Sequence, residues 1–390
     1  MTDALERIAP SVLGERLRLA RSRAGRTQDE AAKFAEISRT TLVAIEKGER
    51  KIRSIELAAL AGLYGVTLNQ LLRDSAIAVD LMPRFRALPG TESAKSESAA
   101  RLLNDLAAAE VELEKLLGRS LVRVYPPERP IGPGDVERQA EDAAMEFRHR
   151  LGRGISPIKD LVILLESEIG LRIYIRPIEE RRISGLFVYD ESVGACMLLN
   201  SHHNAIRRLQ SAAHEVGHFV SSRERPDVDG SFIDTNSREE RFAKAFGFSL
   251  LMPAAAMRSA FSDFVREQGR FSPRHLVILA ARYGVANEAC CRRLEELDLL
   301  KKGTWESLRS RGFSGEFARG ILSEADFENF GGVHGEITPR LWMLAAEAYQ
   351  RELVSEGQLS QMLQLPRVEV RRILDSLDGD VPDDLNEIVE

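Results

Sequence analysis

The chain of 390 residues is too long for one ordinary domain and suits two or three. Its 44% apolar and 29% charged residues are typical of globular proteins and exclude disorder of the whole chain, while a net charge of −6 argues against a surface that coats nucleic acid uniformly. The pattern shows neither a membrane span nor a signal peptide, so we expect a cytoplasmic protein with no membrane contact. The cysteines lack disulfide or metal-knuckle spacing and are expected to be buried core residues: Cys196, Cys290 and Cys291.

The first 74 residues are locally basic, with 13 Lys and Arg against 10 Asp and Glu. Apolar residues at helical spacing predict a helix over residues 12–26. Thr27 and Glu30 then form the pattern of a capping box, and Ser38 is placed to cap a third helix. Residues 54–72 predict two more, so this segment should contain five short helices.

Three motifs of this segment, "GERLRLARSRAGRTQDEAA", "ISRTTLVAIEKGER" and "YGVTLNQLL", resemble the Xre-type helix-turn-helix domain over residues 11–73. The resemblance implies an all-α, five-helix repressor-like fold whose third helix enters the major groove of double-stranded DNA. By position, the implied DNA-binding residues are Ser38, Arg39, Thr40 and Thr41 at base edges, and Gln28 with Arg50 or Lys51 at phosphates. We expect an operator as partner and a homodimer, because such domains usually read paired half-sites. The alternative is a five-helix domain that binds protein alone.

Residues 74–134 are predicted to be a linker and a connecting helix. The linker is rich in Pro, Gly, Ser and alternating charge. The apolar repeat of residues 100–118 predicts a helix that packs on either domain or pairs with a second copy of itself.

A second domain is expected over residues 135–300. Two helical patterns are followed by three β-rich runs, "LRIYIRP", "ISGLFVYD" and "ACMLLN", and then by another helix. This order predicts an α+β domain with a small sheet, followed by a helical C-terminal region over residues 301–390 with an acidic tail.

The helix after the β-rich runs contains the pentapeptide "HEVGH" from His214 to His218. Its flanks are helical in period, so the two histidines lie four residues apart on one face and both imidazoles can reach one ion. Catalytic zinc is usually held by three protein ligands, and a third ligand is therefore required. The following helical run, "SREERFAKAFGFSLLMP", offers Glu239 and Glu240.

"HEVGH" followed by "E-x-x-A-x-x-F-x-x-x-LLMP" from Glu240 to Pro253 resembles the ImmA/IrrE-type metallopeptidases. The resemblance implies metal ligands His214, His218 and Glu240, with Glu239 as the alternative one residue away. Zinc is the expected ion, and Mn²⁺ or Fe²⁺ are alternatives because metal availability competes with affinity. Lys244 and Gly247 stand where this family usually has Asn and Ala.

Such a metal ion lowers the pKa of bound water and polarises a peptide carbonyl. Glu215, next to His214, is the expected catalytic base that takes a proton from water and passes it to the leaving amine. His202 and His203 are candidates for stabilising the oxyanion, and solvated loop residues are the plainer interpretation of this pair.

The family resemblance implies an endopeptidase that cleaves a repressor- or antitoxin-like protein in a stress or mobile-element response. The first hypothesis is therefore a DNA-binding transcriptional regulator that carries a zinc-dependent endopeptidase. The second is a non-enzymatic transcription factor that uses the peptidase fold as a metal or ligand sensor. A third is a scaffold or antitoxin that binds its partner through the C-terminal helices.

Two segments beyond the second motif predict a helix, a turn and another helix. The first has its turn at residues 283–286 and an acidic second helix, which favours a packing role over nucleic-acid binding. The second follows the same logic, with Ser355 as a helix start and Pro366 at the entrance of a later helix.

Overall fold

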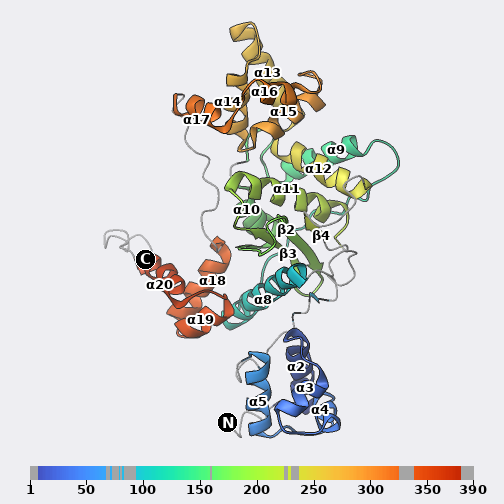
Figure 1. Cartoon of the computed structure of the whole chain (residues 1–390), viewed down its shortest axis with the longest axis vertical. Coiled ribbons are helices and arrows are strands. Elements are labelled where there is room, and N and C mark those ends of the chain that lie inside the picture. The colour runs from blue at the N-terminus through green and yellow to red at the C-terminus, as the bar shows by residue number, and fades with distance from the viewer. Residues whose placement is uncertain are drawn as a thin grey trace. The chain divides into compact units, whose positions relative to one another are not determined.

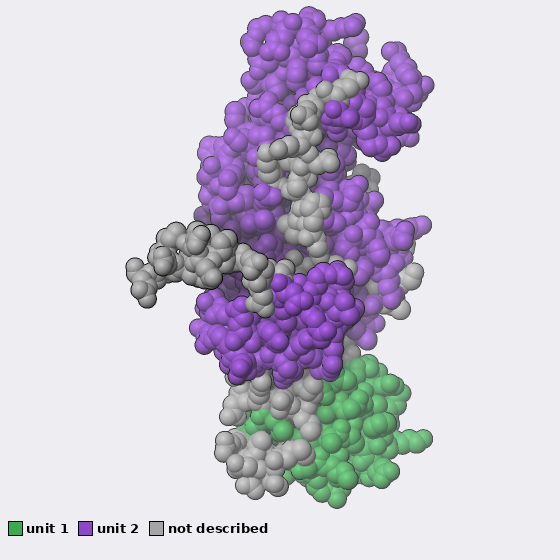
Figure 2. Space-filling model, turned by 90° about the vertical axis from the view of Figure 1, so that its left-hand side faces the viewer, with its two compact units in different colours: residues 1–80 green, residues 81–390 purple. Residues whose placement is uncertain are grey.

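The computed structural model describes residues 8–66, 71–72, 79, 81–82, 94–158, 160–223, 227–229, 237–324 and 338–378. The chain divides into two compact units, residues 1–80 and residues 81–390, which Figure 2 colours green and purple. Among the described residues, no helix has the length and apolar character needed to span a membrane.

The first unit is helical, as expected. Its helices are α2 (Pro10–Arg23), α3 (Gln28–Phe34), α4 (Arg39–Glu46) and α5 (Ser54–Tyr64). The predicted capping box is present, since Thr27 accepts a hydrogen bond from the backbone N–H of Glu30 and Glu30 accepts one from Thr27. Gly65 ends α5 in the left-handed conformation, and most of the fifth predicted helix lies outside the described residues.

The second unit is built around a four-stranded sheet. Its strands are β1 (Arg172–Arg176), β2 (Gly185–Asp190), β3 (Gly194–Asn200) and β4 (Asp227–Asp229), in the order β1-β3-β2-β4. The β1–β3 pair is parallel, and the other two pairs are antiparallel. The first three strands lie in the three β-rich runs of the sequence. The fourth was not predicted, because three residues are too few to show an alternating pattern.

Helices cover the sheet on two sides (Figure 1). On one side, α11 (Ala205–Ser221) packs against β2 and β3, and α12 (Arg238–Leu251) packs against both α11 and α9 (Val136–Arg150). On the other side, α8 (Ala94–Leu116) packs against β1 and β3. Both faces of β3 are therefore buried along its whole length.

The remaining helices complete the second unit. They are α10 (Leu161–Leu164), which continues as the π-helical turn η1 (Leu165–Ile169), α13 (Ala254–Gln268), α14 (Pro273–Tyr283), α15 (Asn287–Glu296), α16 (Thr304–Ser310), α17 (Gly315–Glu324), α18 (Pro339–Gln350), α19 (Glu356–Met362) and α20 (Arg367–Asp378). The turn between α14 and α15 is where the sequence placed it. All three cysteines are buried, as expected.

A buried charge cluster gives α8 its place. Arg172 of β1 is fully buried, and its Nη1 lies 2.6 Å from Glu110 and 2.8 Å from Glu114, which are one turn apart on α8. Arg340 of α18 contacts the same two carboxylates. If α8 moved away from the sheet, the buried charge of Arg172 would lose its partners, which is energetically costly. The cluster therefore holds α8 on the sheet, and Arg340 links α18 to the same carboxylates.

Candidate metal centre

The two histidines of the "HEVGH" segment point the same way from α11. Asn204 caps this helix by accepting a hydrogen bond from the backbone N–H of Arg207, and no proline interrupts it. The Nε2 atoms of His214 and His218 lie 3.1 Å apart. The four-residue spacing therefore brings both imidazoles to one point, as predicted.

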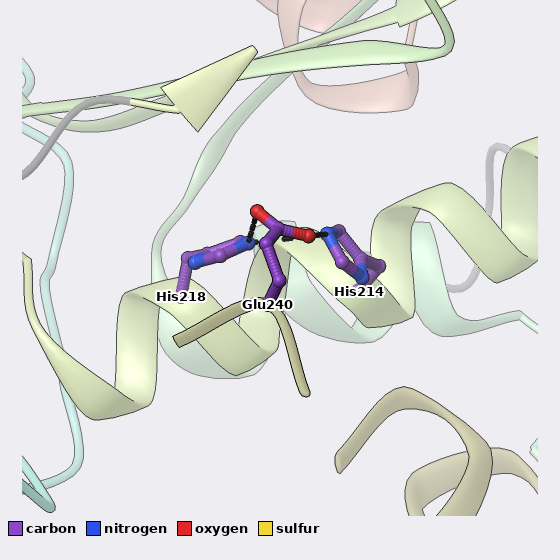
Figure 3. Close-up of side chains that lie close together, drawn as sticks. All are labelled: His214, His218 and Glu240. Atoms are coloured by element: carbon purple, nitrogen blue, oxygen red, sulfur yellow. Dashed lines mark hydrogen bonds and ion pairs between the residues drawn. The ribbon is translucent and has the colours of Figure 1, made fainter. Parts of the chain in front are cut away.

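Glu240 reaches this point from the first turn of α12 (Figure 3). Ser237 caps α12 by accepting a hydrogen bond from the backbone N–H of Glu240 at 3.1 Å. The Glu240 carboxylate lies 3.5 Å from His214 Nε2 and 3.4 Å from His218 Nε2. The neighbouring Glu239 is not part of this group.

The spacing of these three side chains fits a tetrahedral ion. Two ligand atoms that are each about 2.1 Å from such an ion lie about 3.4 Å apart. The measured separations are 3.1, 3.4 and 3.5 Å. Two imidazoles and one carboxylate are also a donor set that suits zinc, so the geometry and the chemistry of the group agree.

Two glycines allow α11 and α12 to approach closely enough to form this group. A Cβ atom on Gly217 would lie 2.6 Å from Ala243 Cα, and a Cβ atom on Gly247 would lie 3.2 Å from the backbone carbonyl carbon of Ala213. The backbones of the two helices are thus in direct contact. Gly247, a departure from the usual family pattern, sits in this contact.

The ionisation of Glu240 reflects its neighbours. Burial opposes the charged form, but the hydrogen bond with His218 and the positive charge of both histidines outweigh it and lower the pKa of this carboxyl. The site therefore favours the carboxylate, the form that binds a cation.

Glu215 follows His214 on α11 and faces strand β2. Its side chain is fully buried, and a Cβ atom on Gly185 of β2 would lie 3.2 Å from its Oε1 atom. Any other residue at Gly185 would press on the carboxylate. The strand thus leaves room for Glu215 beside the two histidines that precede and follow it on α11.

A cavity of about 700 Å³ opens next to His214. It lies between the start of α11, the middle of α12 and the start of α15. Its wall carries both signs of charge, from Arg207, Lys244, Glu288, Arg292 and Glu296. Lys244, the other departure from the family pattern, therefore faces this cavity.

Neither candidate for the oxyanion belongs to the group. His203 is buried, and its Nε2 is 2.9 Å from the carbonyl oxygen of Arg181. His202 is exposed, and its backbone N–H donates to Asn200. These contacts give His203 a structural role in the loop before α11.

In the first unit, the residues predicted to face bases lie at the start of α4. Ser38 accepts a hydrogen bond from the backbone N–H of Thr41 at 3.0 Å and caps the helix. Arg39 and Thr40 are exposed, and Thr41 is half-buried. A contact of these side chains with DNA stays a prediction.

Two of the residues predicted to reach phosphates are also bound within the fold. Gln28 donates to the buried Glu46 at 2.9 Å, and Arg50 donates two hydrogen bonds to the buried Glu56 at 3.1 and 3.0 Å. Lys51 is exposed. These buried acceptors were not predicted, because Glu46 and Glu56 look like ordinary helical surface residues in the sequence.

Two family models match the chain. Residues 12–73 match a helix-turn-helix domain, and residues 166–295 match the IrrE N-terminal-like domain, a peptidase family. The chain therefore combines a DNA-binding helix-turn-helix domain with an IrrE-like domain of metallopeptidase fold, as the two sets of motifs indicated. No curated protein matches the chain.

Proposed function

We propose that this chain is a DNA-binding transcriptional regulator with a zinc-dependent endopeptidase that cleaves a repressor- or antitoxin-like protein in a stress or mobile-element response. The observation that carries the proposal is the convergence of His214, His218 and Glu240 beside the buried Glu215. We take the peptidase domain to span residues 135–300, and the protein to act in the cytoplasm as a homodimer on a double-stranded operator.

The roles of the residues follow from their chemistry. His214, His218 and Glu240 would hold the ion, and a zinc ion supplies a Lewis acid that polarises a peptide carbonyl and lowers the pKa of water. Glu215 accepts a proton from the attacking water and returns it to the leaving amine.

The cavity beside His214 offers room for a peptide segment. Its volume of about 700 Å³ is within the range of ligand sites, and its charged wall suits a polar, extended chain. Arg207 of α11, Lys244 of α12 and Glu288 of α15 provide contacts for side chains of both signs.

The proposal is tested by Glu215→Gln, which removes the base but none of the three ligands. Wild-type and variant proteins are incubated with extract from the source cells, and newly formed protein N-termini are labelled and sequenced. New N-termini should appear with the wild type alone, while both proteins bind equal zinc. Glu239→Gln is the matched control and should cleave like the wild type.

The same N-termini with wild type and Glu215→Gln, at equal zinc content, would contradict the peptidase. That result would favour the non-enzymatic sensor, since both hypotheses share the DNA-binding unit and differ at Glu215.

A further inference from the structure

The helix pair α19–α20 has the same backbone geometry as the helix-turn-helix pair α3–α4. The first helix of each pair has seven residues and begins with a capping box, from Thr27 in one and Ser355 in the other. Each ends two residues before a non-glycine residue in the left-handed conformation, Glu36 with φ 54° and Gln364 with φ 50°. Two other described non-glycine residues adopt this conformation after a helix, but only in these two pairs does the next helix begin three residues later.

The turn between α3 and α4 and the turn between α19 and α20 also share the same backbone hydrogen bond and the same length. The residue after the left-handed one donates its backbone N–H five residues back, from Ile37 to Ala32 and from Leu365 to Ser360, in both cases at 3.0 Å. The second helix then starts two residues later in each pair. The two segments therefore correspond residue by residue, without insertion.

The packing of the two pairs corresponds as well. The preceding helix contacts the second helix of the pair in both cases, α2 with α4 and α18 with α20. Ala31 and Leu359 are buried at the same position of the first helix, and Leu42 and Val370 at the same position of the second. Helices α18–α20 thus form a three-helix unit like α2–α4.

One contact shows that the helices also cross in the same way. In the first unit, Arg39 Nε lies 3.7 Å from Asp29 Oδ1. At the corresponding positions, the Arg367 Nη2 atom lies 3.1 Å from where a Cβ atom of Gly357 would be. Glycine provides no carboxylate there, and within the described part of the chain no ion pair is seen for Arg367, so its guanidinium is available for another anion.

The outer face of α20 has the composition of a DNA-reading helix. Val368 is 69% exposed, and Arg367, Arg371 and Arg372 are exposed around it. Residues 355–374 hold three arginines against two glutamates, whereas the corresponding residues 27–46 hold two basic and four acidic residues. Arginines bind phosphates and guanine edges, and an exposed aliphatic side chain can contact a thymine methyl group.

Acidic groups pair with two of these arginines. Arg371 donates to Glu356 at 3.0 Å, and Arg372 donates to Glu369 at 3.3 Å. Asp375 follows one turn further along α20. The first six residues of α20 therefore hold three arginines and one glutamate, against one arginine in the first six of α4, whereas the second half of α20 is acidic.

The α14–α15 pair shows that the turn alone is not sufficient. It also joins two helices through a left-handed residue, Gly284. Its second helix, however, is buried along Cys290, Cys291 and Leu294, and Arg293 donates within the fold to Glu141. This agrees with the packing role expected from the sequence and leaves α20 as the exposed counterpart of α4.

We propose that α18–α20 is a second helix-turn-helix unit that binds double-stranded DNA, with α20 in the major groove and Arg367, Val368 and Arg372 at the contact. One chain then carries one DNA-binding unit before the peptidase domain in the sequence and one after it, and a single protein can hold two DNA segments or two parts of one operator. This proposal does not depend on peptidase activity.

The test measures binding of the full chain to a fluorescein-labelled duplex of random sequence, several helical turns long, by anisotropy over a range of salt concentrations. The background variant Arg39→Ala/Thr40→Ala weakens the N-terminal reader. In that background, adding Arg367→Ala/Arg372→Ala should weaken binding about tenfold and reduce the slope of log affinity against log salt by about 2.

Arg309→Ala/Arg311→Ala is the matched control. It removes two exposed arginines at the end of α16, which belongs to residues 81–390 but lies outside α18–α20. DNA affinity should stay within about twofold of the background protein. Val368→Glu is a second variant at an exposed position, where the new carboxylate should repel phosphate without disturbing the fold.

Ultraviolet cross-linking of the same duplex, followed by peptide mapping, should recover peptides from residues 367–372 as well as from residues 38–51. Loss of all DNA binding in the background protein, or equal affinities of the α20 variants and the control, would overturn the proposal and leave α18–α20 as a protein-binding or packing unit. Cleavage by Glu215 would be unaffected by that result.

Discussion

Carboxylates have different partners in the first unit and at the candidate metal centre of the second. In the first unit, Glu46 is bound by Arg21 through two hydrogen bonds of 2.6 and 3.1 Å, and Glu56 by Arg50 and Arg53. In the second, Glu240 lies between two imidazoles, which carry a positive charge only when they are protonated. An arginine is always charged and neutralises the carboxylate beside it. Neutral imidazoles do not, so the Glu240 carboxylate can still attract a cation. This contrast separates carboxylates that are paired within the fold from one that is placed to bind a cation.

We expect the largest difference between Glu240 and the arginine-paired carboxylates in the zinc content of the protein. Elemental mass spectrometry of protein purified without added metal should find about one zinc per chain. His214→Ala and Glu240→Ala should each lower this to about a tenth or less, because two ligands bind zinc far more weakly than three. Glu56→Gln, in the first unit, should leave the zinc content unchanged.

If the wild-type protein contains no metal even after zinc is supplied, Glu240 is not a metal ligand and the contrast with Glu46 and Glu56 is wrong. Glu240 would then be a histidine-bound structural carboxylate like those of the first unit. A DNA-binding regulator with a repurposed peptidase fold would remain.

The second prediction compares alanine substitutions at one glycine in each unit and their effects on stability and zinc affinity. Gly217→Ala places a Cβ atom 2.6 Å from the backbone of Ala243, so α11 and α12 must separate, at a cost of about 3 kcal/mol. Zinc affinity should fall at least about tenfold, because the same separation moves Glu240 away from the histidines. Competition with a chromophoric chelator measures this affinity.

Gly62→Ala is the matched control in the first unit. Gly62 lies within α5, and a Cβ atom there would meet no other atom within 4 Å. Alanine should therefore stabilise that helix by about 0.5–1 kcal/mol. Equal effects of the two substitutions would show that the close contact of α11 and α12 does not govern the site.

The third effect is the pH dependence of the first unit. Burial opposes ionisation of Glu56, but hydrogen bonds from Arg50 and Arg53 outweigh it and lower the pKa to about 2. Because the folded pKa lies below the unfolded value, this stabilisation is present above about pH 4.5 and is lost as the pH falls toward 2. Glu56→Gln should cost about 2 kcal/mol at neutral pH and remove this part of the acid sensitivity. Hydrogen exchange of peptides from residues 54–64 measures it, and an unchanged acid profile in the variant would contradict it.

The sequence predicted the parts of the fold that depend on local chemistry. The capping residues Thr27 and Ser38 and the histidine spacing on α11 follow from patterns within one or two helical turns, whereas Glu240 was chosen over Glu239 by the family resemblance. The family resemblances were also confirmed. These features need no knowledge of how distant segments meet.

Features that depend on distant contacts were not predictable in the same way. The packing of α8 on the sheet was left open, although Arg172 in an apolar strand and the pair Glu110 and Glu114 on a helix were a visible charge match. The close contact at Gly217 could not be inferred, because a helical glycine alone does not indicate which backbone approaches it. The likeness of α19–α20 to α3–α4 was present in the spacing of Ser355 and Pro366 but has little sequence identity to reveal it.

The smallest predicted effect is a pH-dependent change in stability caused by Glu166 of η1. This buried carboxyl differs from both Glu56 and Glu240 because its pKa is raised. Burial raises its pKa to about 8, hydrogen bonds from Thr338 and the Arg340 backbone partly offset this, and the charge of Glu110 adds to it. Its folded pKa lies above the unfolded one, so the stability it contributes is full below about pH 4.5 and declines as the pH rises toward 8. The attachment of α18 should thus weaken by about 1 kcal/mol from pH 6 to pH 7, seen as faster hydrogen exchange of residues 338–350, and Glu166→Gln should abolish this slope. If the slope persists in Glu166→Gln, the carboxyl is ionised and bound by Arg340 instead, and it belongs with the arginine-paired carboxylates of the first unit.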